Sequence, residues 1–187
     1  MMAADRIAPP GAMAQRAIAA ANGIDRLVTR LCRFIVLVTG IALTLILTAN
    51  VAARYAFSAG GLDAAQELPE RLFPWFIVAG VVLAAQAGGH MSVEWLFGKL
   101  GPRGGRWLIL FGNAIIVVAY AILFRQALVL ADIAKIEKSP VLGLSGSHGY
   151  WAMALGFALV AIVTICQSVR VLLAGTDARF TLEYKEI

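Results

Sequence analysis

The residues that could carry chemistry in this chain are few and lie far apart. Its two histidines, His90 and His148, stand at the ends of different apolar runs, and neither cysteine, Cys32 or Cys166, has a Cys or His neighbour at the spacing of a zinc site. No GxSxG, HExxH or P-loop pattern occurs. The sequence therefore predicts no enzyme active site, no metal site and no bound cofactor.

One short segment does bring reactive groups together. Residues 62–73 are expected to form a short helix. Glu67 and Arg71 stand four residues apart, as do Arg71 and Trp75, which is the spacing of neighbours on one helix face. That face could hold an ion pair and a stacking contact. The alternative is a solvated surface pair that contributes only about a few tenths of a kcal/mol. Pro74 follows, and its missing N–H predicts a bend where this interfacial helix meets the next apolar run.

The elements that position these groups are four long uncharged runs. The chain has 187 residues, of which 60% are hydrophobic and only 14% charged, more apolar surface than one water-soluble core can hold. Uncharged stretches of 20, 22, 18 and 21 residues cover positions 34–53, 72–93, 107–124 and 149–169. About 20 helical residues cross the hydrocarbon core of a bilayer. The predicted fold class is all-α: a polytopic membrane protein with four transmembrane helices and short interfacial helices.

The distribution of cations predicts the orientation. The net charge of +5 comes from Lys and Arg that flank the apolar runs instead of forming a nucleic-acid-binding stripe. Eleven of them fall in the N-terminal segment, the second loop and the tail, and five fall in the first and third loops. By the positive-inside rule both termini are cytoplasmic, and loops 54–71 and 125–148 face the periplasm. The apolar run of the first span exceeds the usual ~7–15 residues of a cleaved signal peptide, which favours an uncleaved anchor.

The sequence divides the chain into three parts. Residues 1–23 are rich in Ala, Gly, Pro and Arg and are expected to be a poorly ordered cytoplasmic arm, followed by a membrane domain over 24–173 and a tail over 174–187. A tight turn is expected at 101–105. The third span is expected to continue as a helix to about residue 138, where Ser139 and Pro140 stop it, and a compact loop follows.

The spans themselves hold no Asp, Glu, Lys or Arg, the groups that pumps and ion-coupled carriers use as relays. Their amides, Gln86 and Asn113 among them, are expected to bond between helices. Four glycines are expected to mark close helix approaches: Gly80, Gly88, Gly112 and Gly156. An accessory membrane subunit fits these features better than an autonomous carrier.

Three stretches then give a resemblance. They are Asn50 to Phe57, the pattern Glu67-Leu68, Trp75, Gly80, Gly88 and His90-Met91-Ser92-Val93-Glu94, and Ser139 to Leu144. In order and spacing they are similar to the small membrane subunit (Q-type) of tripartite ATP-independent periplasmic (TRAP) transporters, over roughly residues 30–170. The chain departs from that pattern at Gln86, where the family often has a basic residue.

The resemblance implies a non-catalytic scaffold in the bacterial inner membrane. Such a subunit pairs with a large membrane subunit in a sodium-coupled importer of organic acids, to which a periplasmic binding protein delivers the substrate. It also contacts membrane lipids. The residues expected to contact the partner or organise the first loop at the outer face are Asn50, Arg54, Glu67, Arg71 and Trp75, and those at the inner face are His90 and Glu94.

Two alternatives from other classes stay open. One is a self-sufficient small transporter that works as a homo-oligomer, although it lacks the membrane-embedded acid such carriers use. The other is the small subunit of a tricarboxylate-type tripartite importer.

Overall fold

The computed structural model describes residues 12–56, 64–87 and 91–174, except for the side chains of 64, 66, 91–103 and 174. The described residues form four helices: α1 (Ala12–Ala56), α2 (Ala64–Gln86), α3 (Met91–Ile133) and α4 (Ser147–Ala174). Each contains a stretch long and apolar enough to cross a membrane, which confirms the predicted all-α class and the four spans.

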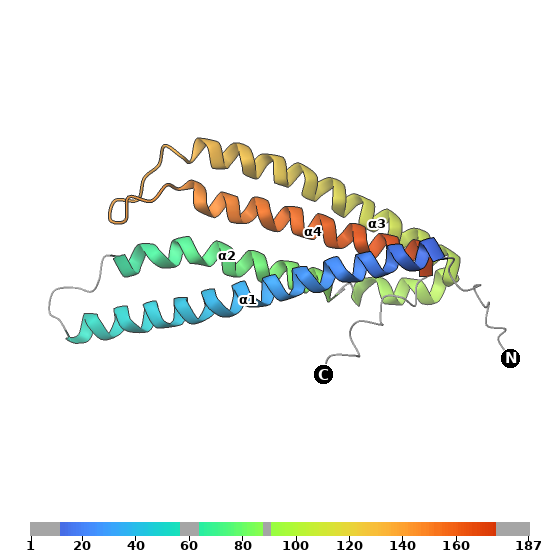
Figure 1. Ribbon diagram of the computed structural model, residues 1–187, viewed down its shortest axis with the longest axis horizontal. Coiled ribbons are helices and arrows are strands. Elements are labelled where there is room, and N and C mark those ends of the chain that lie inside the picture. The colour runs from blue at the N-terminus through green and yellow to red at the C-terminus, as the bar shows by residue number, and fades with distance from the viewer. Residues whose placement is uncertain (1–11, 57–63, 88–90, 175–187) are drawn as a thin grey trace.

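The helices lie in an open layer in the order α1, α2, α4, α3 (Figure 1). α4 contacts each of the other three, whereas within the described residues α3 touches only α4. As a result α4 is the most buried helix, while α1 and α3 leave most of their apolar surface exposed. The four helices thus form an open layer with two broad faces and do not close into a bundle.

The core sits where α1, α2 and α4 meet. Its buried members are small or β-branched and fit between closely spaced backbones: Val28, Cys32, Ala79, Val82, Val160 and Val163. Tyr120 of α3 packs against this cluster and meets Phe157 edge to face at a centroid distance of 5.7 Å. Cys32 thus serves as a small apolar residue of the core.

Close approaches occur at two glycines. A Cβ added at Gly156 of α4 would lie 2.1 Å from Cγ1 of Val78 in α2, and one added at Gly40 of α1 would lie 3.3 Å from the ring of Phe76. The prediction is therefore confirmed for Gly156. It is wrong for Gly80 and Gly112, where an added Cβ meets nothing within 4 Å. Gly88 lies outside the described residues.

The helix ends differ from the sequence-based expectation in several places. α1 begins at Ala12, inside the segment expected to be a poorly ordered arm, because Ala21, Asp25 and Val28 pack against other helices. α2 ends at Gln86, whereas the sequence predicts a second span that reaches residue 93. The short helix expected over 62–73 is not a separate element but the first part of α2, which continues through Pro69 and Pro74.

α3 also departs from expectation at both ends. Its backbone is helical through Gly101 to Gly105, so the prediction of a non-helical tight turn there is wrong. The helix nevertheless changes direction, since its lime-coloured first part does not run parallel to the rest (Figure 1). It ends at Ile133 instead of near residue 138. The loop after it takes over the backbone hydrogen bonds that a longer helix would have made.

Candidate functional site

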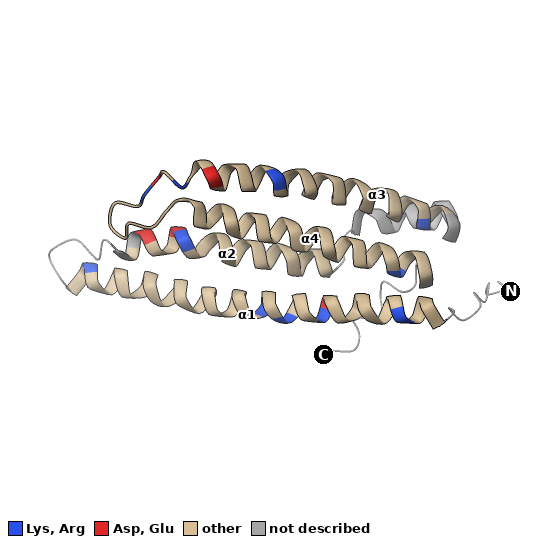
Figure 2. Cartoon of the chain, turned by 45° about the horizontal axis from the view of Figure 1, so that its top comes forward, with Lys and Arg blue, Asp and Glu red and all other residues tan. Residues whose placement is uncertain are grey.

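The polar groups of the chain gather at the two ends of the layer. Figure 2 shows charges at the end where α2 meets the loop between α3 and α4, and a second set along the half of α1 nearer the N-terminus. At the first of these ends, Glu67 and Arg71 of α2 form hydrogen bonds with the loop between α3 and α4. We name these two side chains together with loop 134–146 the clamp.

Glu67 holds one side of this loop. Its carboxylate accepts hydrogen bonds from the backbone N–H groups of Val141 and Leu142, both at 3.0 Å, and from the Ser139 hydroxyl. Arg71 holds the other side by donating to the carbonyl oxygens of Ser145, at 3.0 Å, and Leu144, at 3.5 Å. The two side chains face the loop one turn apart on the helix, as their i, i+4 spacing predicts. They bind its backbone in place of a direct ion pair.

The loop is folded tightly enough to present those backbone groups. Ser139 N–H donates to Leu144 O at 2.9 Å, and Gly143 N–H donates back to Ser139 O at 3.0 Å. Gly143 has a φ of 64°, in the left-handed region that non-glycine residues avoid. Gly146 is constrained by space instead, because a Cβ there would lie 3.2 Å from the carbonyl oxygen of Ala134.

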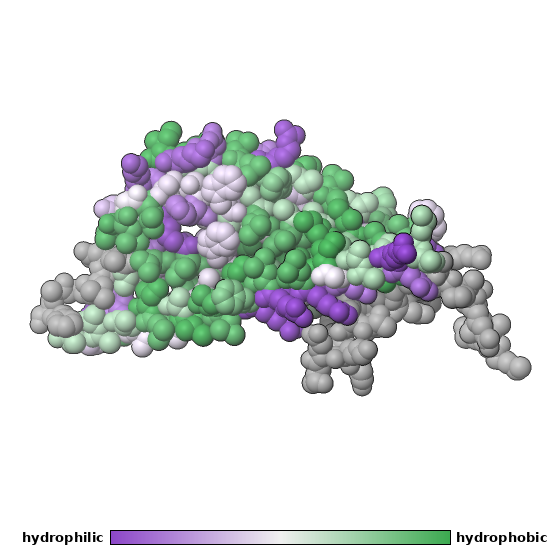
Figure 3. Space-filling view, in the orientation of Figure 1, coloured by the Kyte–Doolittle hydropathy of each residue, from purple (hydrophilic) through white to green (hydrophobic). Residues whose placement is uncertain are grey.

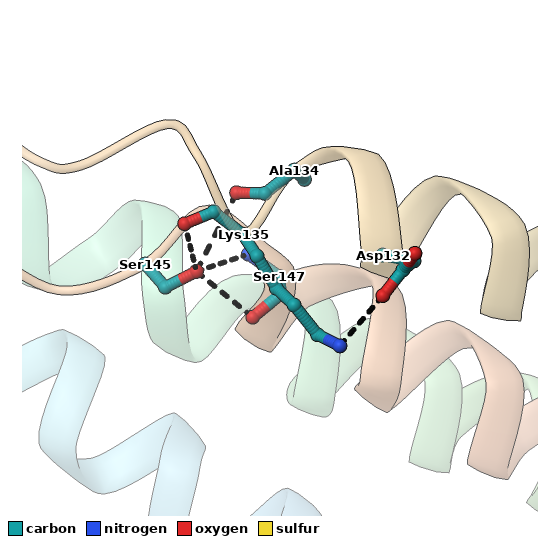
Figure 4. Close-up of polar contacts among 5 residues, drawn as sticks. All are labelled: Asp132, Ala134, Lys135, Ser145 and Ser147. Carbon is teal, nitrogen blue, oxygen red and sulfur yellow. Dashed lines mark hydrogen bonds and ion pairs between the residues drawn. The ribbon is translucent and has the colours of Figure 1, made fainter.

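A serine hydroxyl ties the loop to the start of α4. Ser145 Oγ lies 3.0 Å from Ser147 Oγ and within 3.5 Å of the carbonyl oxygens of Ala134 and Lys135 (Figure 4). Lys135 pairs in turn with Asp132 at 2.6 Å, on the exposed surface. The chain thus enters α4 at Ser147 from a loop whose shape is fixed by its own hydrogen bonds and by the clamp.

Replacing Glu67 by glutamine tests the clamp. The glutamine side chain would keep one acceptor oxygen but lose the charge and the second carboxylate oxygen, so we expect the amides of Val141 and Leu142 to exchange several-fold faster. Hydrogen-exchange mass spectrometry of the loop peptide measures this. Glu70→Gln, an exposed change one turn away, is the matched control. Unchanged exchange in Glu67→Gln would show that the loop holds its shape without the clamp.

Gly143 gives a second test of the same loop. A Gly143→Ala variant forces Cβ into the left-handed region, at a typical cost of about 1–2 kcal/mol, with no neighbour within 4 Å to complicate the result. We expect faster exchange over the loop and little change in α4. Equal exchange in the variant and the wild type would mean that the loop readily adopts another backbone conformation.

The other predicted site residues are more scattered. Asn50 is half-buried near the end of α1, Arg54 is exposed in its last turn, and Trp75 is half-buried in α2. Glu94 lies in α3 with its side chain not described, and His90 lies outside the described residues. Of the predicted residues whose side chains the structure describes, Glu67 and Arg71 are brought together by their bonds to the same loop. Among the described residues no three His, Cys, Asp or Glu side chains are placed to hold a metal ion.

The sequence analysis missed a buried polar cluster at the opposite end. Arg170 of α4 donates to the carboxylate of Asp25 and, at 3.2 Å, to Asn22 Oδ1 of α1, and both members of the ion pair are nearly inaccessible. From α2, Gln86 donates to the carbonyl oxygen of Asp25 at 3.1 Å and accepts from the Thr29 hydroxyl at 3.0 Å. The expected interhelical role of Gln86 is thus confirmed.

A signal for this cluster was present in the sequence. Asp25 stands in register with Ala21, Val28 and Cys32 at i, i+4, i+7 and i+11, the spacing of one buried helix face. A carboxylate on such a face requires a partner. The sequence alone leaves open which distant cation supplies it.

Known proteins match most of this chain in sequence. The model of the DctQ component of tripartite ATP-independent periplasmic transporters matches residues 43–174. An uncharacterised protein of Sinorhizobium fredii, y4mM, is 46% identical over 162 residues; the match covers 87% of this chain but only 30% of that protein. A putative TRAP transporter small permease protein of Haemophilus influenzae is 27% identical over 116 residues, covering 62% of this chain and 71% of that protein. The family match reaches from the second half of α1 to the end of α4 and includes both Glu67 and Arg71, so the chain belongs to the DctQ family of TRAP transporter small membrane components.

Proposed function

We propose that this chain is the non-catalytic scaffold subunit of a sodium-coupled, binding-protein-dependent importer of organic acids. It pairs with a large membrane subunit that carries the substrate and sodium sites. It lies in the bacterial inner membrane with both termini in the cytoplasm, because the cation-rich segments gather on the side of its N-terminus.

The observation that carries this proposal is the open layer with its two exposed apolar edges. The outward face of α1 exposes a continuous apolar row, and the same holds for α3; the rows are Leu37, Ile41 and Leu45, and Phe111, Ile115, Val118 and Ile122. A membrane protein that transports alone needs a polar path between its helices. Here the intramembrane amides are used to join helices, as in the 3.0 Å bond from Asn113 to Ser168 between α3 and α4.

The clamp supports a role in partner binding for the end of the layer that we expect to face the periplasm. It fixes a loop that presents apolar side chains to the surroundings, with Ile136 87% exposed and Val141 51% exposed. We propose that this loop, together with the segment over 54–71, receives the periplasmic binding protein. Asn50 and Arg54 lie in the last two turns of α1, and Trp75 lies in the middle of α2. These three are the further candidates for partner contact, while His90 and Glu94 are the candidates at the inner face.

Affinity purification of the tagged chain in mild detergent tests the pairing. Mass spectrometry should recover one much larger membrane protein at equal stoichiometry. Tryptophan substitutions on the two exposed rows, Ile41→Trp and Ile115→Trp, then locate the partner: the one on the partner-facing row should reduce recovery, and the one facing lipid should not. Recovery of this chain alone, as a defined homo-oligomer that transports after reconstitution, would overturn the scaffold proposal. Uptake by the reconstituted pair with and without a sodium gradient tests the coupling.

A further inference from the structure

The inner half of α1 carries cations that the scaffold role leaves unexplained. α1 has 45 residues and is about 67 Å long, whereas a bilayer core is about 30 Å thick. Residues 12–33 therefore extend beyond the predicted first span. Figure 3 shows a hydrophilic patch over this part of α1, next to the apolar surface of its outer half.

This half of α1 has three distinct faces. At about 100° per residue, Arg26, Arg30 and Arg33 fall within an arc of about 60°, and all three side chains are exposed. The buried face, which contains Ala21, Asp25, Val28 and Cys32, points the other way into α2 and α4. Between them lies an exposed apolar face made of Ile24, Leu27, Leu31 and Phe34, which continues into the exposed row of the span.

The arginine face has no negative charge of its own. Asp25 is the one acid in α1, and it is buried and already paired with Arg170. Within the described part of the chain neither Arg26 nor Arg30 pairs with a carboxylate. An exposed cationic face beside an exposed apolar face, at the end of a span, places arginines at the depth of the headgroup layer, where they attract anionic headgroups.

We infer that the arginine face of α1 binds the headgroups of anionic phospholipids in the inner leaflet, with Leu27 and Leu31 entering the acyl boundary beside them. The inference rests on the proposed orientation of α1. Arg26 and Arg30 are four residues apart, about 6 Å along the axis, which long snorkelling side chains can accommodate within the headgroup layer. Arg16 shares nearly the same face but lies about 15 Å further from the span, outside that layer.

A lipid titration of the full chain in mild detergent tests the inference. Native mass spectrometry counts dioleoyl phosphatidylglycerol or dioleoyl phosphatidylcholine retained by the protein. We expect preferential retention of phosphatidylglycerol. The double variant Arg26→Gln/Arg30→Gln should bind it about 25-fold more weakly, since one basic residue near an anionic surface is worth about fivefold in affinity. Arg16→Gln should bind as the wild type does, and Arg26→Lys/Arg30→Lys should keep the preference.

Two results would overturn the inference. One is equal retention of the two lipids by the wild type. The other is unchanged phosphatidylglycerol binding in the double glutamine variant. If that variant then also fails to recover the large subunit, the arginines contact a protein and not a lipid. Because the titration uses this chain by itself, its outcome is independent of the pairing experiment.

Discussion

Arg170→Met should destabilise the chain more than any other single change considered above, by about 3–5 kcal/mol. The reason is that Asp25 would remain buried after losing Arg170, the one cation that pairs with it among the described residues. Within the same residues its Oδ1 atom already has no hydrogen-bond partner. The same change releases Asn22 Oδ1, so α1 loses its polar attachment to α4. Thermal unfolding in detergent, followed by circular dichroism, measures the loss.

The double variant Asp25→Leu/Arg170→Met separates this explanation from simple loss of packing. With both charges gone, no uncompensated charge is buried, and the stability should return most of the way to that of the wild type. Lys135→Met, which removes the cation of the exposed pair with Asp132, is the matched control and should change stability little. If Arg170→Met and Lys135→Met lower the unfolding temperature equally, the Asp25 pair is not a buried one in the protein.

The sequence predicted the features that depend on composition and failed on those that depend on distant contacts. Four spans follow from the distance between charges, because lipid demands an uncharged helix of fixed length. The ends of α1 and α3 do not follow from composition. Residues 12–25 are helical because Ala21 and Asp25 pack against other helices, and α3 ends at Ile133 because the loop after it forms its own backbone hydrogen bonds.

At the candidate site, too, the sequence predicted the local arrangement but not the distant contacts. The i, i+4 spacing placed Glu67 and Arg71 on one helix face, which holds in the structure. That spacing could not reveal that both would bind a loop more than 70 residues away, since no local pattern encodes which segment packs beside α2. Asp25 and Arg170, 145 residues apart, were missed for the same reason.

Gly156→Ala should separate α2 from α4, even though it adds a single methyl group. The new Cβ would lie 2.1 Å from Cγ1 and 3.2 Å from Cβ of Val78. Val78 is β-branched and has one strongly preferred rotamer in a helix, so it cannot turn away, and the helix backbones must move instead. Overpacking of this kind typically costs about 1–3 kcal/mol. Because α4 carries the contacts to all three other helices, we expect a cooperative loss of stability measured by thermal unfolding in detergent.

Two matched glycines in the same protein show whether the clash or the loss of glycine is responsible. At Gly80 and Gly112 an added Cβ meets nothing within 4 Å, so Gly80→Ala and Gly112→Ala should be neutral or stabilising by up to about 1 kcal/mol. Val78→Ala removes Cγ1, the atom nearest the new methyl group, and therefore Val78→Ala/Gly156→Ala should be more stable than the sum of the two single changes predicts. If Gly156→Ala is as stable as Gly80→Ala, Val78 of α2 does not lie against Gly156 of α4 as closely as the structure places it.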